Sequence, residues 1–227
     1  MKFIHDKKII DRYSDHYTVL VSVNNVTNHA PLIEFSQNLS SKISENYLKD
    51  NIFPLTEKWQ AVFSNMGAKP KYKSSLTSLY DYFQSKNKLY KINPIVDFYN
   101  LYSLYMGMPM AAYDSNMITG TLSLTEPGKD FEFSPLGNPT SRQKTKEREI
   151  AYIDEEKVIC RYWNLQDCDE TKITDKTKNI LFVFDVISNQ NEVNEILKKI
   201  IDDYGAIFSG NIQSGITGIG IGNELSL

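Results

Sequence analysis

The chain has few of the residues that build metal centres and disulfide frameworks. Its 227 residues include two cysteines, Cys160 and Cys168, and three histidines, His5, His16 and His29. The cysteines form no CxxC pair, and the histidines all lie near the N-terminus, outside ligand spacing with one another or with the cysteines. We therefore expect reduced thiols, no metal site, and neither a Ser-His-Asp nor a Cys-His catalytic arrangement.

Long apolar runs and a strong excess of charge are also missing. No stretch approaches the ~20 apolar residues that cross a bilayer, and the start MKFIHDKKII lacks the apolar core of a signal peptide. A cytoplasmic protein without a membrane partner is therefore expected. The net charge of −3 and the pI of about 5.7 argue against a large phosphate-binding surface, although they allow a local basic patch.

Glycine is frequent at the end of the chain, but its pattern there is not one that binds a nucleotide. The tail from Gly210 onward contains Gly215, Gly218, Gly220 and Gly222, with no GxGxxG after a strand and no P-loop lysine. We therefore expect no cofactor and little regular structure in this tail.

The composition itself is ordinary for a globular protein, with 41% hydrophobic, 12% aromatic and 23% charged residues. A chain of this length buries roughly 70–75% of its unfolded surface, so a stable core can form without disulfide bonds or a structural metal ion. Periodicity predicts the following elements. The helices are 31–47, 55–66, one beginning at Ser74 or Ser75, 94–106, and 193–204 ended by Gly205; the strands are 17–23, 122–124, 131–133, 150–153, 158–162 and 180–186.

These elements predict an α/β fold of the α+β kind. We expect one compact domain over residues 1–227, with a mixed or antiparallel sheet packed against helices. The charged segment 142–149 is predicted to be a solvated loop between strands.

The segment INPIVDFYNLYSLYMGMP predicts a central and largely apolar helix. Asn93 is a good N-cap, a proline follows in the first turn, and Gly107 is placed to end the helix. Asp97 and Asn100 lie three residues apart on one side, and they need partners because an unpaired buried polar group costs ~1–3 kcal/mol. A structural hydrogen-bonding role is open for both, and a direct role in a pocket is open for Asn100.

The stretch from 92 to 120 reads INPIVDFYNLYSLYMGMPMAAYDSNMITG. It resembles, without a gap, the editing domain of the phenylalanyl-tRNA synthetase β subunit, which reads roughly N-x-V-D-x-T-N-Y, then G-Q-P-x-H-A-F-D, then a glycine. The matching residues here are Asn93, Val96, Asp97, Asn100, Gly107, Pro109, Ala112, Tyr113, Asp114 and Gly120.

A second stretch, CRYWNLQDCDETKITDKTKNILFVFD, resembles the downstream part of the same domain. In that family a glycine-rich turn ending in a glutamate precedes a strand of the N-D-E-T-x-N-[VI]-L type. The similarity extends from about Trp59 to Ser188. The residues that follow the strand pattern are Thr174, Asp175, Thr177, Asn179, Ile180 and Leu181.

The resemblance implies a role in translation fidelity, with tRNA carrying an aminoacylated 3′ end as the partner; it names no synthetase partner. In the synthetase, this domain hydrolyses wrongly attached amino acid, chiefly tyrosine, from phenylalanine tRNA. A pocket built for phenylalanine discriminates against one extra hydroxyl by only ~10²-fold, which is why a second site is useful. The aminoacyl ester is labile, so a positioned water and oxyanion stabilisation can suffice without a covalent nucleophile.

Site residues carry over position by position. Asn100 matches an asparagine of the editing pocket, Pro109 a proline of its wall, and Ala111 stands where the family has a histidine. The editing glutamate falls at Asp167 when CRYWNLQ is matched to the glycine-rich turn, but this region is longer here, so Asp169 or Glu170 could occupy the place. The resemblance implies Asp167 and Asn100 as catalytic, and a substrate pocket formed by Pro109, Ala111, Tyr113, Gly120, Arg161, Trp163 and Asn164.

Some of these residues have an equally good structural interpretation. Arg161 either clamps a phosphate or carboxylate of a ligand or pairs with a carboxylate of the protein. Trp163 is either a core aromatic or a platform that stacks on a terminal base. Asp114 is expected to cap a turn or the following loop.

Lys69, Lys71 and Lys73 form a basic cluster, KPKYK, with an aromatic residue inside it. The cluster is either a solvated loop or a contact to the tRNA backbone. The alanine at the histidine position and the lack of a second basic region favour a rival hypothesis, a non-catalytic RNA- or protein-binding module that kept the fold and lost the chemistry. Asn100, Pro109 and a nearby acid favour the enzyme, an aminoacyl-tRNA deacylase.

Overall fold

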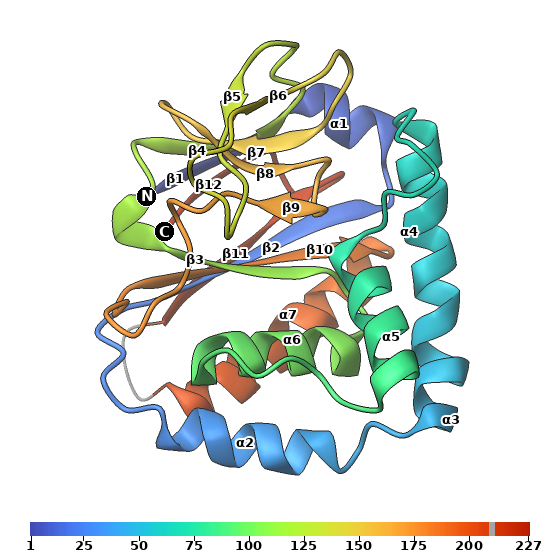
Figure 1. Ribbon diagram of the computed structural model, residues 1–227, viewed down its shortest axis with the longest axis vertical. Coiled ribbons are helices and arrows are strands. Elements are labelled where there is room, and N and C mark those ends of the chain that lie inside the picture. The colour runs from blue at the N-terminus through green and yellow to red at the C-terminus, as the bar shows by residue number, and fades with distance from the viewer. Residues whose placement is uncertain (209–211) are drawn as a thin grey trace.

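The computed structural model describes residues 1–208 and 212–227. The molecule has three layers, which Figure 1 shows one above the other: a six-stranded sheet, a four-stranded sheet, and a layer of helices. Mixed and antiparallel sheets packed against helices confirm the predicted α+β class.

Most helices lie beneath the four-stranded sheet or along one side of the molecule, whereas α1 (Lys7–Arg12) lies at the level of the six-stranded sheet (Figure 1). Their bounds are α1 Lys7–Arg12, α2 Ala30–Ser40, α3 Glu45–Tyr47, a π-helical turn Leu48–Ile52, α4 Phe53–Asn65, α5 Ser75–Lys86, α6 Pro94–Met106, a 3₁₀ turn Ser115–Met117 and α7 Gln190–Ile207. α2, α6 and α7 form the helical layer, while α4 and α5 stand at the side.

The strands form two sheets and a short ribbon. In the six-stranded sheet the order is β12 (Glu224–Ser226), β1 (Lys2–His5), β4 (Thr121–Thr125), β7 (Ala151–Ile153), β8 (Val158–Arg161) and β9 (Gln166–Asp167). In the four-stranded sheet it is β11 (Ile212–Gly218), β2 (His16–Val23), β10 (Ile180–Ile187) and β3 (Met110–Asp114). The ribbon pairs β5 (Glu132–Phe133) with β6 (Gln143–Lys144).

The four-stranded sheet is the centre of the core, because it is covered on both faces. Every residue of β2 is buried, and β10 is buried up to its last residue. On β10, Phe182 packs against Tyr204 of the helical layer, whereas Asp185 contacts Tyr152 of the six-stranded sheet. Burial on both faces explains why these strands read as continuous apolar runs rather than as alternating ones. Both strands were predicted and are confirmed.

The predicted central helix, α6, is confirmed at both ends. The Asn93 side chain accepts hydrogen bonds from the backbone N–H groups of Ile95 and Val96. Gly107 follows the helix with a φ of +71°, and a Cβ there would lie 2.4 Å from Leu55 Cδ1. Both the backbone conformation and the close approach therefore require glycine at this position.

Two predicted helices have different bounds in the structure. The predicted helix 31–47 is interrupted, because Ser44 caps a new turn by accepting from the Tyr47 N–H. Gly205 does not end the last helix, which runs on to Ile207. Tyr204, Ile207 and Phe208 are all buried, and the free energy of burying such side chains exceeds the ~1 kcal/mol that a helical glycine costs.

The prediction of little regular structure in the glycine-rich tail is wrong for its described part; Gly210 itself lies outside the described residues. β11 pairs with β2, and β12 pairs with β1, which was not predicted either. Gly215 lies within β11, where a Cβ would come 2.3 Å from Leu225. The glycine thus lets the two strands of the tail pack closely against each other.

The described residues also bear on membranes and metals. No helix among them combines the length and the apolar character that crossing a bilayer requires. No group of three or more His, Cys, Asp or Glu side chains among them is placed to hold a metal ion.

Candidate functional site

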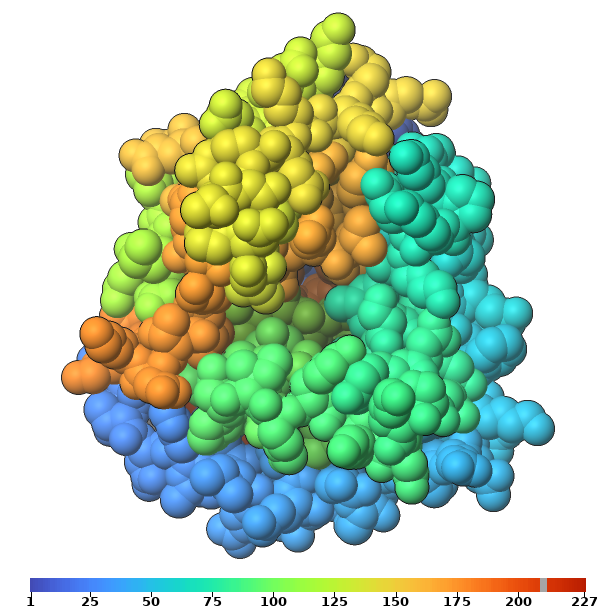
Figure 2. All heavy atoms as spheres, viewed as in Figure 1, coloured from blue at the N-terminus to red at the C-terminus, as the bar shows by residue number. Residues whose placement is uncertain are grey.

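A hollow opens in the face of the molecule that Figure 2 shows. Segments around 131–148 and 160–178 bound it above and at the side, and α5 and α6 bound it below. β3 and β9 are edge strands of their sheets, and a hydrogen bond from Tyr113 to Asp167 joins these two edges. The hollow therefore lies where both sheet edges meet the helices.

Asp167 is the carboxyl group at this junction. The Tyr113 hydroxyl donates to its Oδ1 at 2.9 Å. Burial raises the pKa of Asp167 above its ordinary value, although hydrogen bonds from the Cys160 thiol and the Tyr113 hydroxyl lower it in part. A carboxyl group whose pKa is raised toward neutrality is a more effective general base than a surface carboxyl group.

Other groups surround the same carboxyl. Burial, and after it the negative charge of Asp167, raise the pKa of Tyr99 on α6 and of Cys160 on β8. Asn100 is the next residue on α6, about 100° further round the helix, and it is partly exposed. The structure thus brings Asp167 together with Tyr113 and places the α6 turn that carries Asn100 beside them.

Ala111 shares a strand face with Tyr113, since side chains two apart on a strand point the same way. Ala111 is partly exposed, and its side chain is a single methyl group. Pro109 is buried just before β3, where its carbonyl oxygen accepts from the Asp185 N–H at 3.1 Å. Pro109 therefore fixes the start of the strand that carries the other two residues.

The two alternative acids occupy different positions. Asp169 is buried and accepts from the Gly137 N–H at 2.9 Å and from Lys172 at 2.8 Å. The hydrogen bond from Lys172 lowers the pKa of Asp169. Glu170 is exposed. Asp169 thus anchors the loop around Gly137, which leaves Asp167 as the acid that meets Tyr113.

The turn between β8 and β9 sets the position of Asp167 through an uncommon backbone conformation. Tyr162 and Trp163 have φ values of +47° and +68°, which cost L residues roughly 1–3 kcal/mol each. The Trp163 N–H donates to the Ile150 carbonyl at 2.7 Å, and this bond helps to hold the turn. Left-handed backbone explains why a glycine-rich turn suits this position in the domain that the sequence resembles.

Trp163 and Asn164 face the interior between the two sheets. The Trp163 ring is fully buried and packs edge-on against His16 and Trp59. Its Nε1 donates to Asp185 at 3.2 Å, and Asn164 Nδ2 donates to the same carboxylate at 2.9 Å. Of the two interpretations of Trp163, the geometry is therefore that of a core aromatic.

Arg161 has the protein-internal partner that was one of its two alternatives. Its Nε and Nη2 donate to the two carboxylate oxygens of Glu149, each at 2.7 Å, and its Nη1 donates to Gln143. Both Arg161 and Glu149 are buried. The prediction that 142–149 is a solvated loop is wrong at Gln143–Lys144, which form β6, and at Glu149, which is the buried partner of a strand arginine.

Gly120 lies away from Asp167, whereas the loop of the three lysines lies against the turn that precedes Asp167. Gly120 directly precedes β4, and in the sheet β7 and β8 lie between β4 and β9. A glycine is needed at this position because its φ is +67° and because the Glu155 carboxylate lies close beside it. Lys69 and Lys71 are exposed, and Lys73 pairs with Asp81. Their loop contacts the β8–β9 turn, because the rings of Tyr72 and Tyr162 lie 4.8 Å apart.

Asp114 has the capping role that was predicted for it. Its Oδ1 accepts from the Asn116 N–H at 3.1 Å, and its Oδ2 accepts from the Thr177 hydroxyl at 2.8 Å. It therefore ties the end of β3 to the loop that precedes β10.

Sequence reasoning missed Tyr99 and the group around Asp185. Asp185 interrupts the apolar run ILFVFDVI, and a charge inside a buried strand is a signal that could have identified it. Its partners come from β2, β7 and the β8–β9 turn, and no local pattern links these segments. Tyr99 carries no signal of its own, because the helix around it is rich in tyrosine.

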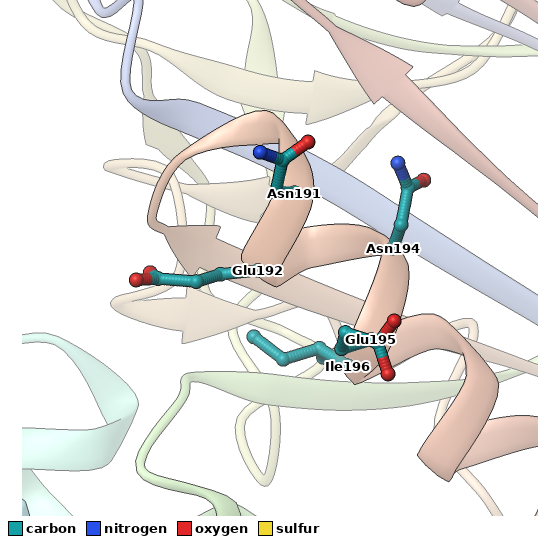
Figure 3. Close-up of a pocket in the computed structure, with 5 residues that line it drawn as sticks. All are labelled: Asn191, Glu192, Asn194, Glu195 and Ile196. Atoms are coloured by element: carbon teal, nitrogen blue, oxygen red, sulfur yellow. The ribbon is translucent and has the colours of Figure 1, made fainter.

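A separate cavity of about 690 Å³ lies at the start of α7. Figure 3 shows its five lining residues projecting from successive turns of one helix. A hydrogen bond from Ser188 lowers the pKa of Glu192. None of the predicted site residues lines this cavity, which is lined by Asn191, Glu192, Asn194, Glu195 and Ile196.

Comparisons with known proteins place this geometry in context. A family model described as B3/4 domain matches residues 58–200, which is more than half of the chain. No curated protein matches. Seventeen chains of solved structures match, among them an N-terminal fragment of the phenylalanyl-tRNA synthetase beta-subunit from Pyrococcus horikoshii, with 13% identity and a TM-score of 0.46. That match covers 95% of this chain and 53% of the other, so this chain spans about half of that structure.

Proposed function

The chain belongs to the B3/4 domain family, and from this premise we propose that it binds the aminoacylated 3′ end of a tRNA and hydrolyses a mischarged ester in trans. The substrate is tyrosine on phenylalanine tRNA or a similar mismatch, encountered in the cytoplasm. The observation that carries the proposal is the carboxyl of Asp167 on β9, which has a raised pKa, is held by Tyr113 and lies near Tyr99 of α6.

The roles of the residues follow from ester chemistry. Asp167 takes a proton from a water molecule as that water attacks the carbonyl carbon, and the Tyr113 hydroxyl fixes the carboxyl in one orientation. The bond from the carbonyl carbon to the ribose oxygen then breaks, and that oxygen leaves with a proton. The partly exposed amide of Asn100 supplies a donor to the developing oxyanion, a contribution of about 10²–10³ in rate.

The alanine at position 111 sets the limits of this chemistry. A methyl group offers no hydrogen bond, charge or proton, so the hydrolytic work rests on Asp167 and Asn100 and on the terminal hydroxyl of the tRNA. A methyl group is also smaller than the imidazole of the family's histidine, which suits an amino acid other than tyrosine. We therefore propose that Ala111 affects which amino acid is removed.

A second candidate function, a binding module without chemistry, is favoured by the same alanine and by the interior positions of Arg161, Trp163 and Asn164. Such a module would bind an RNA and leave the ester intact. The two functions differ in catalytic turnover, because only the enzyme releases the amino acid from the tRNA.

Initial rates of deacylation on a panel of mischarged tRNAs, including tyrosine on phenylalanine tRNA, test the proposal. We expect activity in the wild type, a loss of about 10²-fold or more in Asn100→Ala, and tolerance of Ala111→His with a shift toward the tyrosine substrate. Circular dichroism confirms that the variants fold. A wild type that hydrolyses none of the panel contradicts the enzyme and leaves the binding module.

A further inference from the structure

We propose that an aromatic and basic surface at the end of α5 binds a single-stranded segment of RNA by stacking. The surface consists of the rings of Tyr82 and Tyr90 with the side chains of Lys86, Lys88 and Lys91. It is separate from Asp167 and needs no hydrolysis, so it would serve an editing enzyme and a binding module alike.

The two rings form a ready stacking platform. Their centroids are 3.8 Å apart and their planes are inclined by 24°. Tyr82 covers one face of Tyr90, and Tyr90 is still 50% exposed to solvent. A nucleobase stacks on an open aromatic face whatever its sequence, because every base has a π face.

The charges around the platform favour an anionic partner. Lys86 and Lys88 are exposed, and neither makes an ion pair within the described residues. Lys91 is 84% exposed in side chain and has a loose contact of 3.4 Å to Asp97. Three cations beside a stacked aromatic pair, on a chain whose net charge is −3, form a local basic patch of the kind that tracks a phosphate backbone.

The position of the surface suits a strand that enters the hollow. The segment after α5 passes in front of α6 on its way to the start of that helix (Figure 1). In Figure 2 the surface below the hollow has the colour of α5 and of this segment. An RNA end that lies in the hollow can therefore cross the platform on the same face of the molecule.

This surface corrects the sequence analysis, which recognised one basic cluster with an aromatic residue inside it. The stretch KNKLYK has the same character. The stacked pair also needs Tyr82, which lies eight residues before Tyr90 in the sequence. Tyr82 can stack on Tyr90 only when α5 has formed and has ended between the two residues. Asn87 makes this possible by ending the helix with a φ of +49°.

The test is fluorescence anisotropy with a labelled single-stranded RNA oligonucleotide of about ten nucleotides ending in CCA, using the full chain. We expect Tyr90→Ala to weaken binding about tenfold, and Tyr90→Phe, which keeps the ring, to bind as the wild type does. A plot of log K against the logarithm of the salt concentration has a negative slope, to which each phosphate contact on a single strand contributes about 0.7. Replacing Lys86, Lys88 and Lys91 by glutamine should therefore reduce the magnitude of this slope by about 2. The matched control replaces Lys8, Lys49 and Lys198, which are exposed elsewhere, and should leave the slope unchanged.

Three results would overturn the proposal. The first is that Tyr90→Ala does not change the RNA affinity, and the second is that the wild type binds no single-stranded RNA. The third is that Tyr90→Leu binds as well as the wild type, which would indicate that the surface docks an apolar part of a protein. Deacylation is measured separately on the same samples. RNA binding that persists without deacylation contradicts the hydrolytic function and leaves this surface in place.

Discussion

The Asp167 carboxyl illustrates how one side chain obtains its chemistry from neighbours that are distant in sequence. Tyr113 comes from β3, Tyr99 from α6 and Cys160 from β8. Matching of motifs selects Asp167 from three nearby acids, but it says nothing of these neighbours, because they meet only when the edges of the two sheets come together. The sequence therefore selects an acid for the site, but it does not predict the groups that surround this acid.

Tyr113→Phe tests the link between the hydroxyl and the acid. The variant keeps the ring and loses one donor to Asp167, so we expect the carboxyl pKa to rise further. Deacylation should nevertheless fall about tenfold, because the carboxyl is no longer held in one orientation. Net stability should change by only about 1 kcal/mol, the usual value of one hydrogen bond. Steady-state deacylation and urea unfolding measure the two effects, and an unchanged rate would show that the hydroxyl does not position the acid.

The pH dependence of stability provides a test without RNA. Because burial raises the pKa of Asp167, the folded protein holds this proton more tightly than the unfolded chain does. The resulting stabilisation is complete below the ordinary value of 3.8 and is lost as pH rises through the raised pKa. Asp167→Asn removes this titration, so the variant should gain stability relative to wild type as pH increases from 4 toward neutrality. Urea unfolding midpoints of both proteins, measured at several pH values, test this expectation. A difference between the two midpoints that does not change with pH would contradict the raised pKa.

Elements whose signals are local were predictable. α6 has its cap residue, its first-turn proline and its terminal glycine within the fifteen residues from Asn93 to Gly107, and all three act as expected. β1, β11 and β12 were missed because their pairing is long-range, as between Lys2 and Ser226. The end of α7 was misplaced because tertiary burial of Tyr204 and Ile207 outweighs the local effect of Gly205.

The left-handed backbone of the β8–β9 turn predicts that glycine is more stabilising than alanine at position 162, although alanine is ordinarily the more stabilising of the two. Tyr162→Ala loses the ring that packs on Tyr72 and keeps a left-handed backbone. Tyr162→Gly loses the same ring but removes the steric cost of roughly 1–2 kcal/mol. We therefore expect the glycine variant to be more stable than the alanine variant by about 1 kcal/mol. Thermal unfolding compares them, and an alanine variant that is equal or better would show that the turn is unstrained.

The two sheets are joined through a buried carboxylate. Asp185 on β10 accepts hydrogen bonds from Tyr152 on β7 and from Trp163 and Asn164 of the turn that leads to the candidate site. Thus Asp185 and the Tyr113–Asp167 hydrogen bond both fix the layer that carries Asp167 to the central sheet. Sequence alone indicates that a charge in a buried strand needs partners, but it does not identify them.

Asp185→Ala should therefore destabilise the whole fold. It removes the acceptor of three buried donors and also the partner of His16 Nε2. Each unpaired donor costs about 1–3 kcal/mol, so we expect a loss of more than about 3 kcal/mol and a fall in Tm of about 10 °C. Asp185→Asn, the matched control, keeps one oxygen and should lose less. Calorimetry of both variants measures this, and equal Tm values for wild type and Asp185→Ala would contradict the role of the carboxylate.

The central claim is that Asp167 is the base of an ester hydrolysis, and its most direct test is the single-turnover rate of deacylation as a function of pH. With tyrosine on phenylalanine tRNA, or the best substrate of the panel, the account predicts a wild-type rate that rises through an apparent pKa above the ordinary value of 3.8 and then reaches a plateau. Asp167→Asn should be slower by about 10²-fold or more and should lose this rise. An Asp167→Asn variant with the rate and the pH profile of the wild type would contradict the account.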